Sequence, residues 1–229
     1  MTRLFTRLFT RLTNEIGELY QSAYKSNHNT ETALIRVHND IAMAIDQRNS
    51  AILVLFDVSA AFDTVDHGLL LSRLSNRFGI AGTVLEWFRS YLSDPTQFVQ
   101  VNDACSASHV LESGVPQGSV LGPLLYSLYK SPLGEIARQH QMLYHFYADD
   151  TKLYITFRTS SVSDMNLSNT KSVNCVRDVD AWMLSNNLKL NKDKSEVLVI
   201  SSSHRPRPPL SSAEISNETA QKVQAQKVH

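Results

Sequence analysis

Two adjacent aspartates, Asp149 and Asp150, lie between two short apolar runs in the segment HFYADDTKLY. If these runs form a hairpin, the acids occupy its tip, where successive side chains point to different sides. Neighbouring carboxylates raise each other's pKa, and a bound divalent cation removes that cost. Such oxygen ligands suit Mg²⁺, which binds through one or two carboxylates plus substrate phosphates. A solvated acidic turn is the alternative interpretation.

A third acid, Asp57, ends the apolar run AILVLF (51–56), which has the length and composition of a buried strand. A carboxylate at the end of a strand is held on a rigid scaffold, as metal chemistry requires. The same residue could instead cap the turn that follows. Asp57 is therefore a candidate ligand that needs support from elsewhere in the chain.

The loop SGVPQGS (113–119) is the third candidate feature, because Gly114 and Gly118 flank Pro116 and Gln117. Glycine lets the backbone approach a ligand closely. The start of the apolar helix expected after the loop offers unpaired N–H groups to an anion or a polar substrate edge. A plain loop before a helix remains the other reading.

The elements that must position these residues mix helices with strands. Apolar periodicity and capping signals predict helices over 30–46, from Asp66 to Gly79, over 82–92 and over about 172–187. Strands are predicted over 51–56, 96–101, 106–112, 142–147, 152–157 and 196–201. Several of these strands are joined as hairpins, which favours an α+β domain with helices on one face of an antiparallel sheet.

Composition narrows the function classes. The 22 basic and 22 acidic residues give zero formal net charge, whereas a free-standing nucleic-acid binder is usually basic. The two cysteines, Cys105 and Cys175, have no metal-ligand spacing, so a structural zinc site is improbable and a reducing, intracellular setting fits. No apolar run approaches the roughly 20 residues of a membrane helix, so no membrane partner is expected.

Both ends of the chain are unusual. Residues 1–19 carry the repeat TRLFTRLFTRLT, which could form a basic helix of a transit peptide or a membrane surface, or could be a short sequence duplication. Residues 202–229 are polar, contain RPRPP and lack periodicity, so we expect a disordered tail. The domain proper is therefore expected over 20–201.

In their order and on these element types, FDVSAAFD, SGVPQGS and YADD resemble the polymerase palm of reverse transcriptases, most closely those of non-LTR (LINE-type) retrotransposons. QSAYKSNHNTETAL (21–34) resembles their finger segment, and NNLKLNKDKSEVLVI resembles a further palm stretch. The resemblance covers about residues 20–200. It implies a palm-like antiparallel sheet with partial fingers, truncated at both ends relative to the full enzyme.

The resemblance also implies catalytic roles. Asp57, Asp149 and Asp150 match the three acids that bind metal, and Asp150 matches the more tolerant position. Lys194 matches a lysine near the triphosphate that protonates the leaving pyrophosphate. Two Mg²⁺ ions, or Mn²⁺ ions, about 4 Å apart would then serve the primer 3′-hydroxyl and the triphosphate.

Four further positions match nucleotide- or template-binding residues. Phe62 matches the bulky residue that crowds the 2′ carbon of the incoming sugar and so favours deoxynucleotides. Gln117 and Gly118 match the loop that packs on the nucleotide and the template strand. Lys25 matches a finger position more often held by arginine, and lysine lacks the bidentate fork of arginine on phosphate.

The implied function is RNA-directed DNA polymerase, with an RNA template, a DNA primer and deoxynucleoside triphosphates as partners. Thumb and endonuclease sequences are not recognisable, so we expect weak or no activity in isolation, with the missing segments supplied by a longer parent protein. A catalytically inactive, domesticated palm that binds nucleic acid or protein is the alternative. A palm-like nucleotidyl cyclase is more remote, because it would not need PQG followed by this helix.

Overall fold

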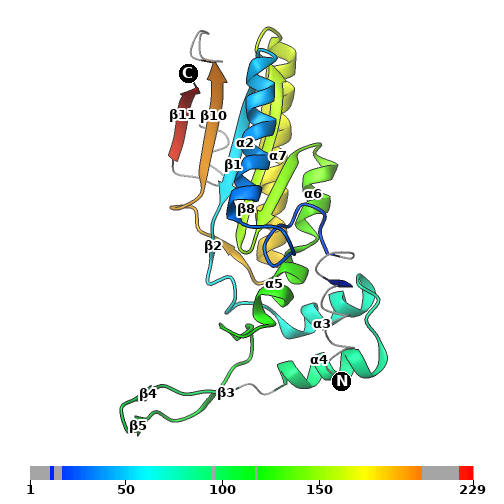
Figure 1. The fold of residues 1–229 in the computed structure, drawn as a ribbon, viewed down its shortest axis with the longest axis vertical. Coiled ribbons are helices and arrows are strands. Elements are labelled where there is room, and N and C mark those ends of the chain that lie inside the picture. Colours follow the sequence, from blue (N-terminus) through cyan, green and yellow to red (C-terminus); the bar gives the residue numbers. More distant parts are fainter. Residues whose placement is uncertain (1–10, 13–16, 94–95, 117, 203–221, 229) are drawn as a thin grey trace.

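A five-stranded sheet is the centre of the fold. The computed structural model describes residues 11–12, 17–93, 96–116, 118–202 and 222–228 (Figure 1). The strand order is β11-β10-β1-β8-β7. The central strand β1 pairs antiparallel with β8 and β10, and β7 pairs antiparallel with β8. The strands run over Asn49–Phe56 (β1), Leu143–Tyr147 (β7), Asp150–Arg158 (β8), Glu196–Ser202 (β10) and Lys222–Val228 (β11).

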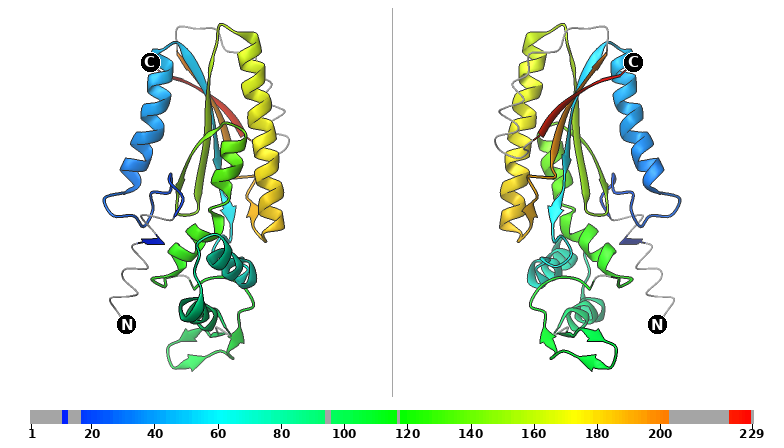
Figure 2. Two further views of the ribbon diagram at one scale, coloured as in Figure 1. Left: turned by 90° about the vertical axis from the view of Figure 1, so that its right-hand side faces the viewer. Right: turned by 90° about the vertical axis from the view of Figure 1, so that its left-hand side faces the viewer.

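Helices cover both faces of this sheet, so the prediction that they lie on one face was wrong. Helix α2 (Thr30–Asp46) packs on one face through a cluster that includes Ala51 and Leu53 of β1. Helix α7 (Val162–Ser185) packs on the other through the cluster that includes Ile52 and Val54 (Figure 2). The continuous apolar run of β1 is the physical reason, because a strand that is apolar on both sides must be covered on both.

The predicted helix starts are largely confirmed. The Asp66 carboxylate accepts a hydrogen bond from the Leu69 N–H at 2.8 Å and caps α3 (His67–Asn76). Helix α4 spans Gly82–Leu92, as expected. Helix α2 has the predicted bounds, but its capping side chain belongs to Asn29 rather than Thr30.

Helix α7 begins about ten residues before the predicted start. Ser161 caps it by accepting from the Asp164 N–H at 3.1 Å. Its buried stripe includes Ser168 and Ser172, and these polar residues interrupt the apolar periodicity that would have revealed the first turns.

Short elements extend the fold below the sheet. The chain enters α5 (Gly122–Lys130) and α6 (Leu133–Gln139) after the glycine-proline loop, and a two-stranded ribbon joins β2 (Val58–Ser59) to β9 (Lys189–Leu190). The predicted hairpin around residues 102–103 is confirmed, and it projects away from the sheet (Figure 1). Its strands are β3 (Thr96–Gln97), β4 (Gln100–Val101), β5 (Ala104–Cys105) and β6 (His109–Val110).

The two ends of the chain differ in what the structure describes. The expectation of disorder does not hold over Lys222–Val228, because β11 pairs in parallel with β10. Residues 203–221, and most of the repeat-bearing segment 1–19, lie outside the described residues. Within the described part of the chain, no helix is long and apolar enough to cross a membrane.

Candidate active site

The acidic pair lies at the tip of the β7–β8 hairpin, as predicted. Tyr147 pairs with Asp150, which leaves Ala148 and Asp149 as the two-residue loop. Ala148 has a φ of 52°, a left-handed conformation that is uncommon for a residue other than glycine and that tight hairpin loops require. The side chain of Asp149 therefore starts from a sharply turned backbone, whereas Asp150 already belongs to strand β8.

Asp57 lies at the same end of the strands as the acidic pair. Phe56, the last residue of β1, is paired with Thr151 of β8, so Asp57 follows directly opposite the start of β8. The Asp57 N–H donates to Ser195 Oγ at 3.3 Å, and its carbonyl accepts from the Asn191 N–H at 2.9 Å. The backbone of Asp57 is thus fixed from both sides by the segment that leads into β10.

The three aspartates are nevertheless not gathered into one compact cluster. Across the part of the chain that the structure describes, no group of three or more His, Cys, Asp or Glu side chains is placed to hold a metal ion. Asp149 occupies the loop, whereas Asp150 is the first residue of β8 and is exposed, and successive residues there direct their side chains differently. The assignment of all three as metal ligands remains a prediction.

Lys194 lies in the turn that fixes Asp57. Its N–H donates to the Asn191 carbonyl at 3.2 Å, and Ser195 next to it supplies the hydroxyl that accepts from Asp57. The side chain of Lys194 is exposed. The fold therefore joins the Lys194 segment to the Asp57 segment through the main chain and leaves the ammonium group toward solvent.

Phe62 packs beside the glycine-proline loop. Its ring centroid lies 4.9 Å from that of Tyr126 in α5, and its carbonyl accepts from the Val115 N–H at 2.8 Å. A Cβ on Gly114 would lie 2.9 Å from the Asp63 carbonyl oxygen, so this glycine permits a close approach of backbone to backbone. The close approach at Gly114 is thus to the backbone of Asp63, and the approach to a ligand expected from the two glycines stays a prediction.

The other glycine of the loop behaves differently. Gly118 has a φ of 80° and open space around an added Cβ, so its conformation rather than crowding favours glycine there. Gln117 lies outside the described residues.

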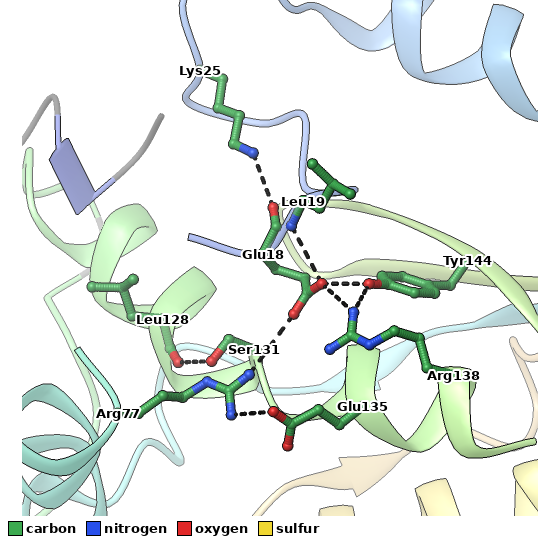
Figure 3. Close-up of polar contacts among 9 residues, drawn as sticks. All are labelled: Glu18, Leu19, Lys25, Arg77, Leu128, Ser131, Glu135, Arg138 and Tyr144. Atoms are coloured by element: carbon green, nitrogen blue, oxygen red, sulfur yellow. Dashed lines mark hydrogen bonds and ion pairs between the residues drawn. The ribbon is translucent and has the colours of Figure 1, made fainter. Parts of the chain in front are cut away.

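Lys25 takes part in a polar cluster around Glu18 (Figure 3). Its Nζ donates to the Glu18 carbonyl at 2.9 Å, and partial burial lowers the pKa of this lysine. The Glu18 carboxylate is buried and accepts from Arg138 Nη1 at 2.8 Å and from the Tyr144 hydroxyl. Arg77 approaches the same carboxylate at 4.0 Å. The cluster ties the segment around residues 17–25 to α3, α6 and β7.

Sequence reasoning missed three side chains around the acidic loop. The charge of Asp149 adds to burial in raising the pKa of Tyr24 and of Tyr126. The Tyr126 hydroxyl is buried and has no hydrogen-bond partner among the described residues. Burial lowers the pKa of Lys130 to about 7, against the opposing effect of Asp149 and Asp150. The signal for Lys130 was a charged residue in the otherwise apolar helix that follows the loop.

A match to a known protein family identifies the family of this chain. The family described as reverse transcriptase (RNA-dependent DNA polymerase) matches residues 2–227. The chain belongs to the reverse transcriptase family. This confirms the resemblance drawn from FDVSAAFD, SGVPQGS and YADD.

Curated relatives of this reverse transcriptase domain include polymerases of mobile elements from Drosophila melanogaster. The probable RNA-directed DNA polymerase from transposon X-element is 28% identical over 198 residues, covering 83% of the chain and 20% of that protein. The polymerase from mobile element jockey is 33% identical over 138 residues, covering 58% of the chain and 15% of that protein. The chain thus spans a fifth or less of these relatives, and they support the assignment to the LINE-type branch.

Solved structures similar to the reverse transcriptase domain include yeast telomerases. Telomerase from Candida tropicalis in complex with a TWJ fragment of telomeric RNA has a TM-score of 0.63 at 13% identity and covers 86% of this chain and 33% of that one. Apo telomerase from the same organism, truncated from its C-terminal domain, has a TM-score of 0.62 at 12% identity, covering 89% of this chain and 41% of that one. At such low identity these matches show the fold alone, and they confirm the palm-like α+β class.

Proposed function

We propose that the chain is the palm, with part of the fingers, of an RNA-directed DNA polymerase that joins a deoxynucleotide to a primer 3′-hydroxyl on an RNA template. One observation carries this proposal: the pairing of Phe56 with Thr151 puts Asp57 beside the hairpin that bears Asp149 and Asp150. Asp57 directly follows β1, Asp149 lies in the tight loop between β7 and β8, and Asp150 begins β8. All three are thus attached to one rigid sheet, which suits a site whose geometry must be held closely.

The donor chemistry of this edge fits Mg²⁺ or Mn²⁺. Asp57, Asp149 and Asp150 would hold the ions, since Mg²⁺ usually binds through one or two carboxylates and completes its shell with substrate phosphates. When bound, such ions supply charge stabilisation for nucleotidyl transfer and lower the pKa of a coordinated hydroxyl. The protein contributes position and charge at the sheet edge.

Other residues would select and hold the nucleotide. Two contacts support Phe62 as the gate at the sugar 2′ carbon. Tyr126 packs against its ring, and the Val115 N–H donates to its main-chain carbonyl. Lys194 would donate a proton to the pyrophosphate, and its exposed ammonium, on a turn bonded to Asp57, suits that role. Gln117 and Gly118 would contact nucleotide and template.

Lys25 would bind the triphosphate from the finger side. In the structure its ammonium donates to the neutral Glu18 carbonyl. A phosphate oxygen is the stronger acceptor for a charged donor, so the proposal requires Lys25 to exchange one acceptor for the other. The remaining surfaces that hold an RNA template and a DNA primer would come from a longer parent protein.

Primer extension on an RNA template with Mg²⁺ tests the proposal. We expect slow, distributive extension by this chain, abolished in Asp57→Ala and Asp149→Ala. The exposed Asp103 lies in the projecting hairpin, so Asp103→Ala is the matched control and should extend like the unmodified chain. Extension that persists in Asp149→Ala would remove that residue from the site. Binding of template–primer with no extension, also after family-like flanking segments are joined, would favour an inactive binding module.

A further inference from the structure

Lys130 is a lysine in the protein core. It ends α5, and its side chain is 1% exposed to solvent. Lysine is almost never fully buried unless its ammonium group is satisfied. Here the Nζ donates to the main-chain carbonyl of Asp150 at 3.0 Å and to Thr151 Oγ1 at 3.4 Å. Both acceptors belong to the first two residues of β8, immediately after the acidic loop.

Two aromatic rings enclose the ammonium group. The Nζ lies 4.9 Å from the ring centroid of Phe146 in β7 and 5.8 Å from that of Tyr126, one helical turn earlier in α5. A cation over a ring face is attracted by the ring quadrupole. Together with the two hydrogen bonds, these rings fix the ammonium beneath the acidic loop from both strands of the hairpin.

At the start of β8, one side faces the core and contacts Lys130, and the other side faces solvent. The inner side of the hairpin start is occupied, because the Asp150 carbonyl and the buried Thr151 hydroxyl both bind Lys130. The Asp150 side chain is exposed on the other side. Any shift of the loop toward the core would compress the lysine, and any shift outward would break its hydrogen bonds to the carbonyl and the hydroxyl.

Lys130 also connects two parts of the candidate site. Helix α5 begins three residues after Ser119, the last residue of the glycine-proline loop, and carries Tyr126, on which Phe62 packs. One side chain at the end of that helix reaches the strand that carries Asp150. The loop, the Phe62 side chain and the acidic hairpin therefore share a single rigid support.

We propose that Lys130 is a positioning residue that holds the acidic loop, and with it Asp149 and Asp150, against α5 and so sets where the carboxylates lie relative to Phe62. This inference rests on the proposed polymerase function for its consequence in catalysis. The positioning itself is a property of the folded chain and can be measured without turnover.

The first experiment measures amide hydrogen exchange in Lys130→Met, a variant of similar length that keeps the contacts with the rings and loses the donor. We expect the amides of residues 150–153 to exchange about tenfold faster or more, the change expected from loss of one charge-assisted hydrogen bond, while the centre of β1 stays protected. The control is Lys171→Met, because Lys171 donates at the surface, to Gln141 Oε1 at 2.7 Å.

If Lys130→Met does not fold, Lys130→Gln keeps a shorter donor in the same place and should give a smaller, equally local acceleration. Unchanged exchange at residues 150–153 in a folded variant would overturn the inference. Equal acceleration across all strands would also overturn it, because that result describes general destabilisation.

The second experiment is single-turnover primer extension. We expect Lys130→Met to lower the rate of nucleotide incorporation about tenfold with little change in the apparent Kd for the deoxynucleotide, because misplaced carboxylates affect the reacting state more than binding. Incorporation equal to that of Lys171→Met would refute the catalytic consequence. Absence of extension by the otherwise unmodified chain, also after family-like flanking segments are joined, would instead count against the proposed function, and the exchange result would stand.

Discussion

Replacing Glu18 with alanine should destabilise the protein strongly, although this residue is not one of the candidate catalytic aspartates. Glu18 is 9% exposed and accepts hydrogen bonds from Arg138 Nη1 at 2.8 Å, from the Leu19 N–H at 3.3 Å and from the Tyr144 hydroxyl. Removing the carboxylate leaves the buried hydroxyl of Tyr144 without that acceptor. The segment that Glu18 anchors would then lose its tie to Arg138 of α6 and to the Tyr144 side chain, while Tyr20 and Ser22 keep their main-chain hydrogen bonds to Phe146.

The expected size follows from these contacts. A hydrogen bond to a charged group contributes about 1.5–3 kcal/mol. The Glu18 carboxylate accepts more than one, and the Tyr144 hydroxyl would lose its acceptor but keep Arg138 Nη1 as a donor. Arg138 is half exposed and Arg77 approaches only to 4.0 Å, so their ion pairing adds little. We therefore expect a loss of about 3 kcal/mol in the free energy of unfolding, or roughly 6–12 °C in Tm for a domain of this size.

Urea unfolding followed by far-ultraviolet circular dichroism measures this loss. The matched control is Glu86→Ala, which removes a surface glutamate whose Oε2 lies 3.4 Å from Arg89 Nε with both side chains more than half exposed. That change should cost less than about 0.5 kcal/mol. If Glu18→Ala were no more destabilising than Glu86→Ala, the buried carboxylate would not be the anchor inferred from the structure.

Three further predictions address the loop, the pH dependence and the gate. Gly114→Ala should lower the free energy of unfolding by about 2 kcal/mol or more, because φ is 95° and the new Cβ would lie 2.9 Å from the Asp63 backbone oxygen. Urea titration measures this loss. The control is Gly79→Ala, which should cost less because φ is 66° and there is open space around the new Cβ. Burial lowers the pKa of His145 from 6.5 to about 4, so the unfolded chain binds a proton between these values and the folded chain does not. Stability should thus fall by about 2 kcal/mol from pH 7 to pH 5, and this part of the loss should vanish in His145→Gln. Phe62→Val should raise ribonucleotide incorporation relative to deoxynucleotide incorporation in primer extension; an unchanged ratio would reject Phe62 as the gate.

Local signals in the sequence predicted much of the fold. Asp66 as a cap, the helix bounds 82–92 and both hairpins depend on residues close together in the chain, and all agree with the structure. Helix α6 was not predicted, because Gly134 in its first turn discourages a helix. That glycine is needed for a tertiary reason, since a Cβ there would lie 2.6 Å from Glu18 Cδ.

The candidate site divides in the same way. The sequence motifs identified Asp57 and the acidic pair as candidates. The register of β1 and β8 is what brings these residues to the same end of the sheet. Neither the turn that fixes Asp57 through Asn191 nor the contact of Lys130 with Asp150 could be predicted, because each joins segments separated by a long stretch of chain. Lys25 is a different case, because its partner is close in sequence. Nevertheless, nothing in the sequence indicated that the Glu18 carbonyl would accept a hydrogen bond from the Lys25 ammonium group.

The parallel pairing of β11 with β10 has a consequence for handling this protein. The register joins all seven residues of β10, from Glu196 to Ser202, to Lys222–Val228. A shortened version that stops after β10 would leave a row of main-chain donors and acceptors open along a largely apolar strand, which invites edge-to-edge association between copies. Expression trials of the palm should therefore keep the chain through residue 228, and a soluble yield that falls on removal of residues 222–228 would trace aggregation to that uncovered strand.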